Sequence, residues 1–192
     1  MAIQNQQILE IVNLLRNKFS NFSLVNIIED LEKAIEDFGV KVFYSNMEGF
    51  DDPMSISGYS QVNKKGHPEI IVNGNESFER RRFTIAHELG HIILHWGWLN
   101  EVGQTLDRNL TEIQFRKTKF SYGNGQETKE QQANHFAAEL LLPLETLKNF
   151  INDESLDTEL KRIMLITNIS KVFKVSESFA RIQLSKLEKQ TT

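Results

Sequence analysis

The feature that most constrains this chain is a long apolar helix pattern with ionisable residues inside it. The segment SFERRRFTIAHELGHIILHW repeats apolar residues at helical spacing and opens on Ser77, a residue type that caps helix N-termini. Three histidines fall in it at four-residue steps, His87, His91 and His95, and Glu88 follows the first. Burying such groups is unfavourable unless they are paired or bind a metal. The pattern predicts either a metal-dependent catalytic centre or a helix with histidines along one edge.

Helix geometry separates the three histidines into two kinds. Residues four apart differ by about 6 Å of rise and about 40° of rotation, so His87 and His91 can bind one ion. Glu88 is turned about 100° from His87, which places its carboxylate beside the ion, where it can act as a general base. His95 lies about 12 Å of rise from His87 and is expected beside the site, or as a wall of its cleft.

A catalytic zinc needs a third protein ligand and a fourth position left for water. The chain has no cysteine, so the ligand must be a histidine or a carboxylate. A second helix is predicted over 127–143, where Glu130 adjoins an apolar face that contains small alanines. We expect Glu130 to be the third ligand, with Glu127 one turn earlier as the alternative. His135 is rotated about 140° from Glu130 and should point elsewhere.

Other polar residues have weaker claims to a catalytic role. Tyr122 could hydrogen-bond an oxyanion, although a tyrosine in a glycine-rich loop is more often packed. His67 stands in a predicted turn. The three arginines at 80–82 are interpreted as a solvated helix face with one structural salt bridge at most.

The remaining segments predict an α+β fold. Helical and alternating apolar patterns give, in chain order, helices over about 5–18 and 23–39, strands over 40–44, 54–62 and 69–73, the histidine helix over 77–96, helices over 127–143 and 144–151, and two or three short helices within 161–187. Residues 97–126 are polar and irregular, and we expect a long loop or insertion there. The three strands predict a small sheet beside the histidine helix.

Two units are expected, a catalytic domain over 1–152 and a helical subdomain over 153–192. The second unit resembles a helix-turn-helix, with basic residues at its surface. These residues are Lys171, Lys174, Arg181 and Lys186. They are few and diluted by acidic neighbours, so a subdomain that packs on the rest of the chain is favoured over DNA binding.

Composition limits the class of protein. The 192 residues suit one domain with a small appendage, and 40% hydrophobic with 25% charged residues is ordinary for a globular protein. The absence of cysteine fits a reducing compartment. No targeting signal or long apolar run is evident, so a cytoplasmic protein without membrane association is expected. The net charge of −4 argues against a general nucleic-acid coat.

Two blocks together make the sequence similar to the ImmA/IrrE family of metallopeptidases. They are RRRFTIAHELGHIILH (80–95) and EQQANHFAAELLLP (130–143), supported by SGYSQVNKKGHPEIIVN and the tail FKVSESFARIQLSKL. The resemblance covers about residues 20–187. It implies a zincin-like fold, zinc ligands at His87, His91 and Glu130, and Glu88 as general base. The long 97–126 segment departs from the family pattern and widens the gap between the blocks.

The same resemblance implies a function in gene regulation. Similar proteins cleave or otherwise inactivate a helix-turn-helix repressor of a prophage, a mobile element or a stress locus. Some members carry an N-terminal DNA-binding domain, which we do not expect here. The leading hypothesis is a zinc metallopeptidase that makes a limited cut in a regulatory protein. A regulator that sequesters a repressor or antitoxin without cutting it, and a transcription factor that binds DNA through its C-terminal helices, are the alternatives.

Overall fold

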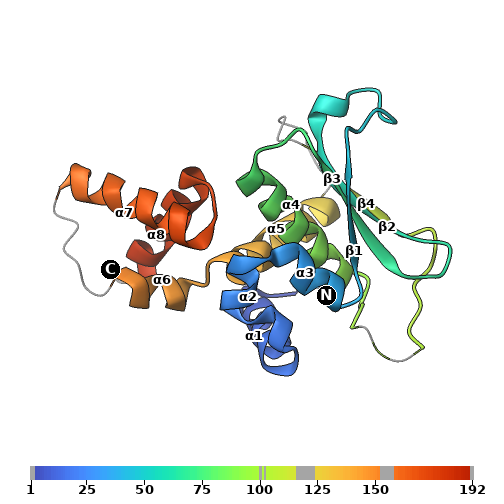
Figure 1. Cartoon of the computed structure of the whole chain (residues 1–192). Coiled ribbons are helices and arrows are strands. Elements are labelled where there is room, and N and C mark those ends of the chain that lie inside the picture. The colour runs from blue at the N-terminus through green and yellow to red at the C-terminus, as the bar shows by residue number, and fades with distance from the viewer. Residues whose placement is uncertain (1–2, 100, 102, 116–123, 152–157, 191–192) are drawn as a thin grey trace.

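Helix α4 (Phe78–Leu94) lies between a mixed sheet and helix α5 (Asn124–Leu141), as Figure 1 shows. The computed structural model describes residues 3–99, 101, 103–115, 124–151 and 158–190, and it describes no side chains within 112–127. Ser77 caps α4 as expected, because its side chain accepts a hydrogen bond from the Arg80 amide. The α+β class predicted from the sequence is confirmed.

The sheet has four strands in the order β1-β3-β2-β4. Strands β1 (Lys41–Ser45), β2 (Ile56–Val62) and β3 (Pro68–Asn73) are the three that the sequence predicted. Strand β4 (Thr111–Phe115) corrects the expected three-stranded sheet, since it lies in the segment predicted to be a loop. It pairs antiparallel with β2, whereas β1 runs parallel to β3.

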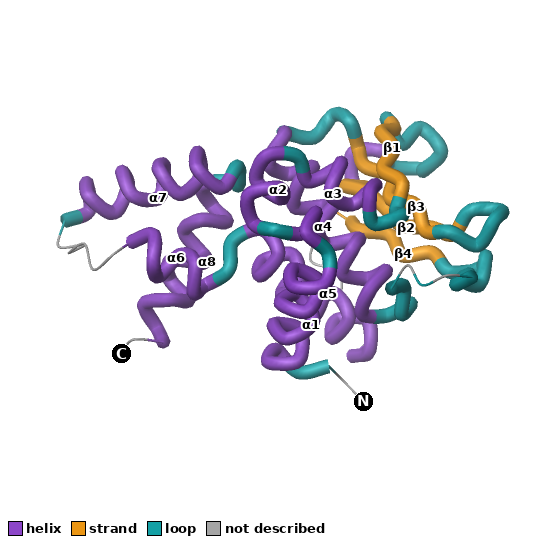
Figure 2. Tube along the Cα trace, turned by 60° about the horizontal axis from the view of Figure 1, so that its bottom comes forward, coloured by secondary structure: helices purple, strands orange, loops and turns teal. Residues whose placement is uncertain are grey.

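The N-terminal helices cover one side of α5, as the second view shows (Figure 2). Helix α1 (Asn5–Lys18) leads through the short turn η1 (Ser20–Phe22) into the next helical segment. The single helix expected over 23–39 is instead two, α2 (Leu24–Glu29) and α3 (Leu31–Asp37). The break is at Asp30, whose non-helical backbone and side-chain hydrogen bond to the Lys33 amide make it the N-cap of α3. A short turn, η2 (Pro53–Ser55), precedes β2.

The C-terminal helices α6 (Leu144–Ile151), α7 (Glu159–Phe173) and α8 (Glu177–Gln190) group together at one end of the molecule (Figures 1 and 2). They share one continuous apolar core with the rest of the chain. Helix α6 contacts α8 although it precedes the boundary expected at residue 152. Division into units 1–152 and 153–192 therefore stays a prediction. Among the described helices, none is long and apolar enough to cross a membrane.

Arg82 joins three parts of the fold and corrects the interpretation of 80–82 as a solvated face. Its side chain is only 4% exposed. Its Nε donates to the Lys174 carbonyl and its Nη2 to the Ile27 carbonyl, at 3.1 and 2.9 Å. Burial lowers the pKa of Arg82, yet both carbonyls accept from its charged form. The residue thus fastens α4 to α2 and to the end of α7. Lys174 in turn donates from Nζ to the Glu29 carbonyl.

Candidate metal centre

Close packing of α4 against α5 sets the distance across the site. A Cβ atom placed on Gly90 would lie 3.2 Å from Ala133 Cα and 3.2 Å from Phe136 Cδ1. Contacts this short leave little room for any side chain at position 90. Glycine on one helix and alanine on the other therefore let the backbones approach, which brings residues of the two helices within reach of a common ion.

His87, His91 and Glu130 meet at this contact. The two Nε2 atoms are 3.1 Å apart, and each lies 3.2 Å from one Glu130 carboxylate oxygen. Four ligands placed tetrahedrally at zinc bond lengths are separated by about 3.3 Å. Each residue thus offers one atom to a possible metal ion, and both histidines are fully buried. The spacing fits a small tetrahedral cation.

The protonation of His87 supports a cation among these groups. Its Nδ1 lies 3.1 Å from Asn134 Oδ1, which can only accept, so Nδ1 carries the proton. A His87 that carries only this proton turns the Nε2 lone pair toward Glu130. Burial alone would raise the pKa of Glu130, but hydrogen bonds from His87 and His91 and the positive charge of their protonated forms outweigh burial and lower that pKa to about 2. Two lone-pair atoms face each other, so a proton or a metal ion must lie between them.

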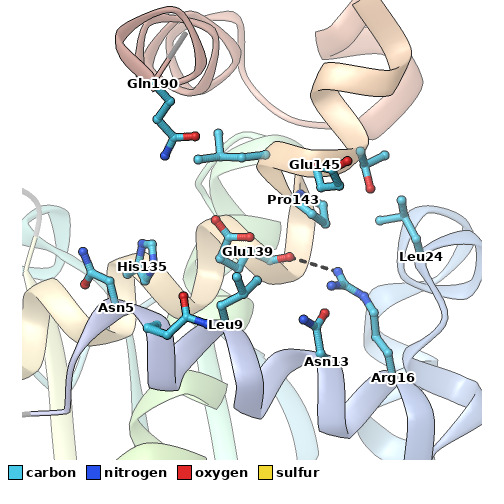
Figure 3. A pocket seen from close by; sticks show the side chains of 13 residues that line it. Asn5, Leu9, Asn13, Arg16, Leu24, His135, Glu139, Pro143, Glu145 and Gln190 are labelled. Carbon is cyan, nitrogen blue, oxygen red and sulfur yellow. Dashed lines mark hydrogen bonds between the residues drawn. The ribbon is translucent and has the colours of Figure 1, made fainter.

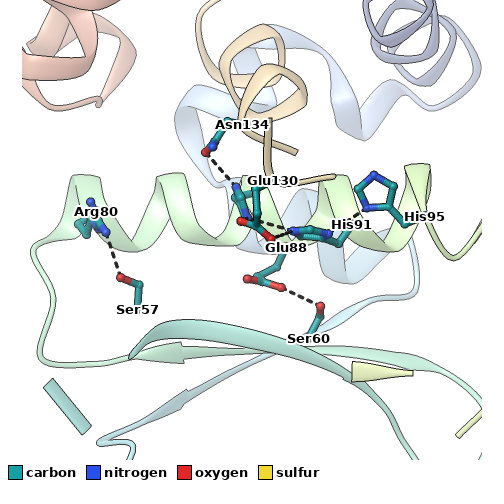
Figure 4. Close-up of polar contacts among 9 residues, drawn as sticks. Ser57, Ser60, Arg80, Glu88, His91, His95, Glu130 and Asn134 are labelled. Carbon is teal, nitrogen blue, oxygen red and sulfur yellow. Dashed lines mark hydrogen bonds and ion pairs between the residues drawn. The ribbon is translucent and has the colours of Figure 1, made fainter. Parts of the chain in front are cut away.

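Glu88 lies beside the candidate ligands, and one of its two carboxylate oxygens accepts a hydrogen bond (Figure 4). Ser60 Oγ on β2 donates to Glu88 Oε2 at 2.7 Å. Oε1 is buried without a hydrogen-bond partner among the described residues. Burial raises the pKa of Glu88, although His87, His91 and Ser60 act in the opposite direction. An unsatisfied carboxylate oxygen next to a candidate metal site suits a group that exchanges protons with a reactant.

A glycine also controls how closely the sheet approaches Glu88. A Cβ on Gly58 would lie 2.6 Å from Thr84 Cγ2 of α4 and 2.9 Å from the Ile71 carbonyl. Only glycine at this position lets β2 lie against α4, which brings Ser60 within reach of Glu88.

Other candidate residues from the sequence are placed as follows. His95 lies beside His91, with their Nδ1 atoms 2.9 Å apart. His67 stands near Trp98, away from the ligands, at 5.8 Å between ring centroids. Tyr122 and the Glu127 side chain lie outside the described residues. Asn134, one helical turn after Glu130 on α5, lies beside His87. Ser60 and Gln132 complete the surroundings of the site, although no short sequence pattern had marked them.

A surface cleft lies elsewhere, among α1, α5 and α6 (Figure 3). His135 lines it, which agrees with the expectation that this histidine points away from Glu130. Arg16 crosses it and donates from Nη2 to the carbonyls of Glu139 and Leu140 at the end of α5. None of the candidate metal ligands lines this cleft.

Comparison with known protein families agrees with this geometry. The model of the M78 peptidases, described as the IrrE N-terminal-like domain, matches residues 35–185. The chain belongs to the ImmA/IrrE family of peptidases. The match contains α4 and α5 and therefore all four candidate residues of the site. Membership supports peptidase activity at the level of the family.

One curated relative of the chain is a phage protein. The chain is 32% identical over 99 residues to the uncharacterized immunity region protein 2 of Bacillus phage phi105. The alignment covers 52% of this chain and 52% of the relative, so the chain spans about half the length of the curated protein that it matches.

Proposed function

We propose that this protein is a zinc metalloendopeptidase that makes a limited cut in a regulatory protein. The observation that carries the proposal is the triangle of His87, His91 and Glu130, beside which Glu88 Oε1 has no hydrogen-bond partner among the described residues. Two imidazoles and one carboxylate form a donor set typical of catalytic zinc sites that leave the fourth position open. The absence of cysteine is compatible with action in the reducing cytoplasm.

The roles of the residues follow from their positions. Zinc held by the three ligands would polarise the scissile carbonyl and acidify a water molecule. Glu88 receives the proton of the attacking water on Oε1 and later delivers it to the leaving amine. Ser60 holds Oε2, so the carboxylate keeps one orientation through both transfers. Asn134 keeps the proton of His87 on Nδ1, which leaves Nε2 free to bind the ion.

The proposed substrate is a helix-turn-helix repressor encoded near this protein's gene. The immunity-region name of the phage relative supports this class of partner. The protein would be mixed with zinc and the product of the neighbouring reading frame, and the products resolved by mass. We expect one discrete cut and two complementary fragments.

Glu88→Gln tests the mechanism within this experiment. The variant should bind zinc and leave the substrate intact, because an amide cannot accept the proton. Glu79→Gln, on the same helix but away from the ligands, is the matched control and should cut normally. A Glu88→Gln protein that still cuts contradicts the proposed role of Glu88. If wild type inactivates the repressor without fragments, and Glu88→Gln does so equally well, sequestration replaces proteolysis as the function.

A further inference from the structure

A chain of hydrogen bonds runs from His91 to the backbone in front of α1. His91 Nδ1 lies 2.9 Å from His95 Nδ1, a contact drawn in Figure 4. His95 Nε2 lies 3.0 Å from Gln132 Oε1, and Gln132 Nε2 donates to the Ile3 carbonyl at 2.8 Å. Three successive contacts therefore connect a candidate metal ligand on α4 with α5 and with the N-terminal segment.

The Ile3 carbonyl determines which atom donates and which accepts in every hydrogen bond of this chain. The Ile3 carbonyl can only accept, so the amide nitrogen of Gln132 faces it and the amide oxygen faces His95. That oxygen also only accepts, and His95 Nε2 must therefore carry a proton. A neutral His95 then has a bare Nδ1, which accepts the proton of His91 Nδ1.

The result for His91 is a single tautomer. Its proton is held on Nδ1, so its Nε2 lone pair points to the position between His87 and Glu130. Gln132 is buried and His95 is half-buried, which limits the water that could replace either partner. Groups that orient a ligand histidine in this way raise its affinity for the metal.

We propose that His95 and Gln132 are positioning residues that hold His91 in its metal-binding tautomer, with Ile3 as the anchor. The inference rests on the proposed function in one respect, because it takes His91 as a zinc ligand. It adds that the zinc affinity depends on the N-terminal segment, although that segment contains no ligand. The two imidazole ligands are then oriented independently, His87 by Asn134 and His91 by this chain.

The test uses the full-length protein with His95→Phe and Gln132→Met, each of which removes hydrogen bonding with little change in size. His135→Phe is the control, since this histidine is also partly buried but lines the cleft among α1, α5 and α6, which contains none of the candidate metal ligands. Zinc affinity would be measured by competition with a chromophoric chelator. We expect a loss of about 10- to 100-fold for His95→Phe, a smaller loss for Gln132→Met, and none for His135→Phe.

A second measurement detects the contact directly. In zinc-loaded protein with 15N-labelled histidine, a 15N–15N coupling across the hydrogen bond should join His91 Nδ1 to His95 Nδ1. The coupling should persist in His135→Phe. Its absence from wild type, or unchanged zinc affinity in both His95→Phe and Gln132→Met, overturns the inference. Neither readout requires cleavage, so a protein that shows both effects but cuts no substrate refutes the proposed peptidase activity alone.

Discussion

Ser60 on β2 and Glu88 on α4 are joined by a 2.7 Å hydrogen bond that crosses from the sheet to the histidine helix. Both residues are fully buried, so no solvent competes for this contact. The hydroxyl donates to one carboxylate oxygen and leaves the other, Oε1, without a partner among the described residues. The hydrogen bond from the sheet therefore determines that Oε1, and not Oε2, is the oxygen of Glu88 that can contact a reactant.

Ser60→Ala should raise the pKa of Glu88 further, because the Ser60 hydrogen bond favours the ionised carboxylate. A general base must be ionised to accept a proton, so the acidic limb of the activity profile should move to higher pH. The cleavage rate near neutral pH should fall about tenfold. This loss is smaller than the full contribution of general-base catalysis, because the carboxylate is still present in the variant. Initial cleavage rates across pH check this, and an unshifted acidic limb would show that Ser60 does not tune Glu88. Ser55→Ala, at a half-buried serine just before β2, is the control.

Exchange of Glu88 for glutamine should stabilise the metal-free protein at neutral pH. Burial raises the pKa of Glu88 above its ordinary value of 4.5, so folding favours the protonated form. The stability that protonated Glu88 contributes is fully present below the pKa of this residue in the unfolded chain. It is lost as the pH rises through the higher pKa of the residue in the folded protein. Glu130 does not oppose this trend, because its lowered pKa of about 2 keeps it ionised throughout.

Urea denaturation in the presence of a chelator measures this effect. Between about pH 5 and pH 8, wild type should lose stability relative to Glu88→Gln, and the difference should reach about 1–3 kcal/mol. Glu79→Gln controls for the change of net charge. Equal pH dependence in wild type and Glu88→Gln would mean that the Glu88 carboxylate is not destabilised by burial.

The sequence predicted the framework of the site well, because the framework depends on local periodicity. The apolar spacing of the two segments placed His87 and His91 on one helix and Glu130 on another, and the structure brings these three residues together. The break at Asp30 was missed because the apolar spacing of 23–39 continues through it, although an aspartate can cap a new helix. Strand β4 was missed because a five-residue strand in a polar segment owes its place to pairing with β2.

Contacts between elements could not be predicted in the same way. Ser60 reaches Glu88 only because β2 lies across α4, and Gly58 permits that approach through contacts that no local pattern encodes. The chain from His95 through Gln132 to Ile3 likewise joins three distant parts of the sequence. Helical arithmetic predicted that His95 lies beside the ligand triangle, but it could not show which atom its ring would contact.

Glu130→Gln and Glu127→Gln separate the two candidates for the third ligand. Glu130 has a carboxylate oxygen 3.2 Å from each imidazole Nε2, so its amide variant should bind zinc at least 100-fold more weakly. Glu127→Gln should bind zinc as wild type does. Isothermal titration with zinc provides both affinities, and a loss confined to Glu127→Gln would transfer the assignment to that residue.

Gly90→Ala tests whether the close approach of α4 and α5 builds the site. Alanine improves helix propensity by about 1 kcal/mol, whereas overpacking costs about 1–3 kcal/mol. The added methyl would lie 3.2 Å from the Ala133 backbone, which cannot move aside without shifting α5, so the unfavourable effect should dominate. We expect a lower melting temperature and weaker zinc binding in the same variant. Gly49→Ala, with no atom within 4 Å, is the control and should change neither.

Removal of the metal should abolish cleavage without unfolding the protein. The apolar core runs continuously from α1 to α8 and does not depend on the candidate ligands for its packing. Three side chains among the described residues converge on the proposed ion, so its loss exposes little apolar surface. Treatment with a chelator should therefore leave the far-ultraviolet circular dichroism unchanged and eliminate substrate fragments, and added zinc should restore them. A protein that loses its helical signal with the metal would show instead that the ion holds α4 and α5 together, as in a structural zinc site.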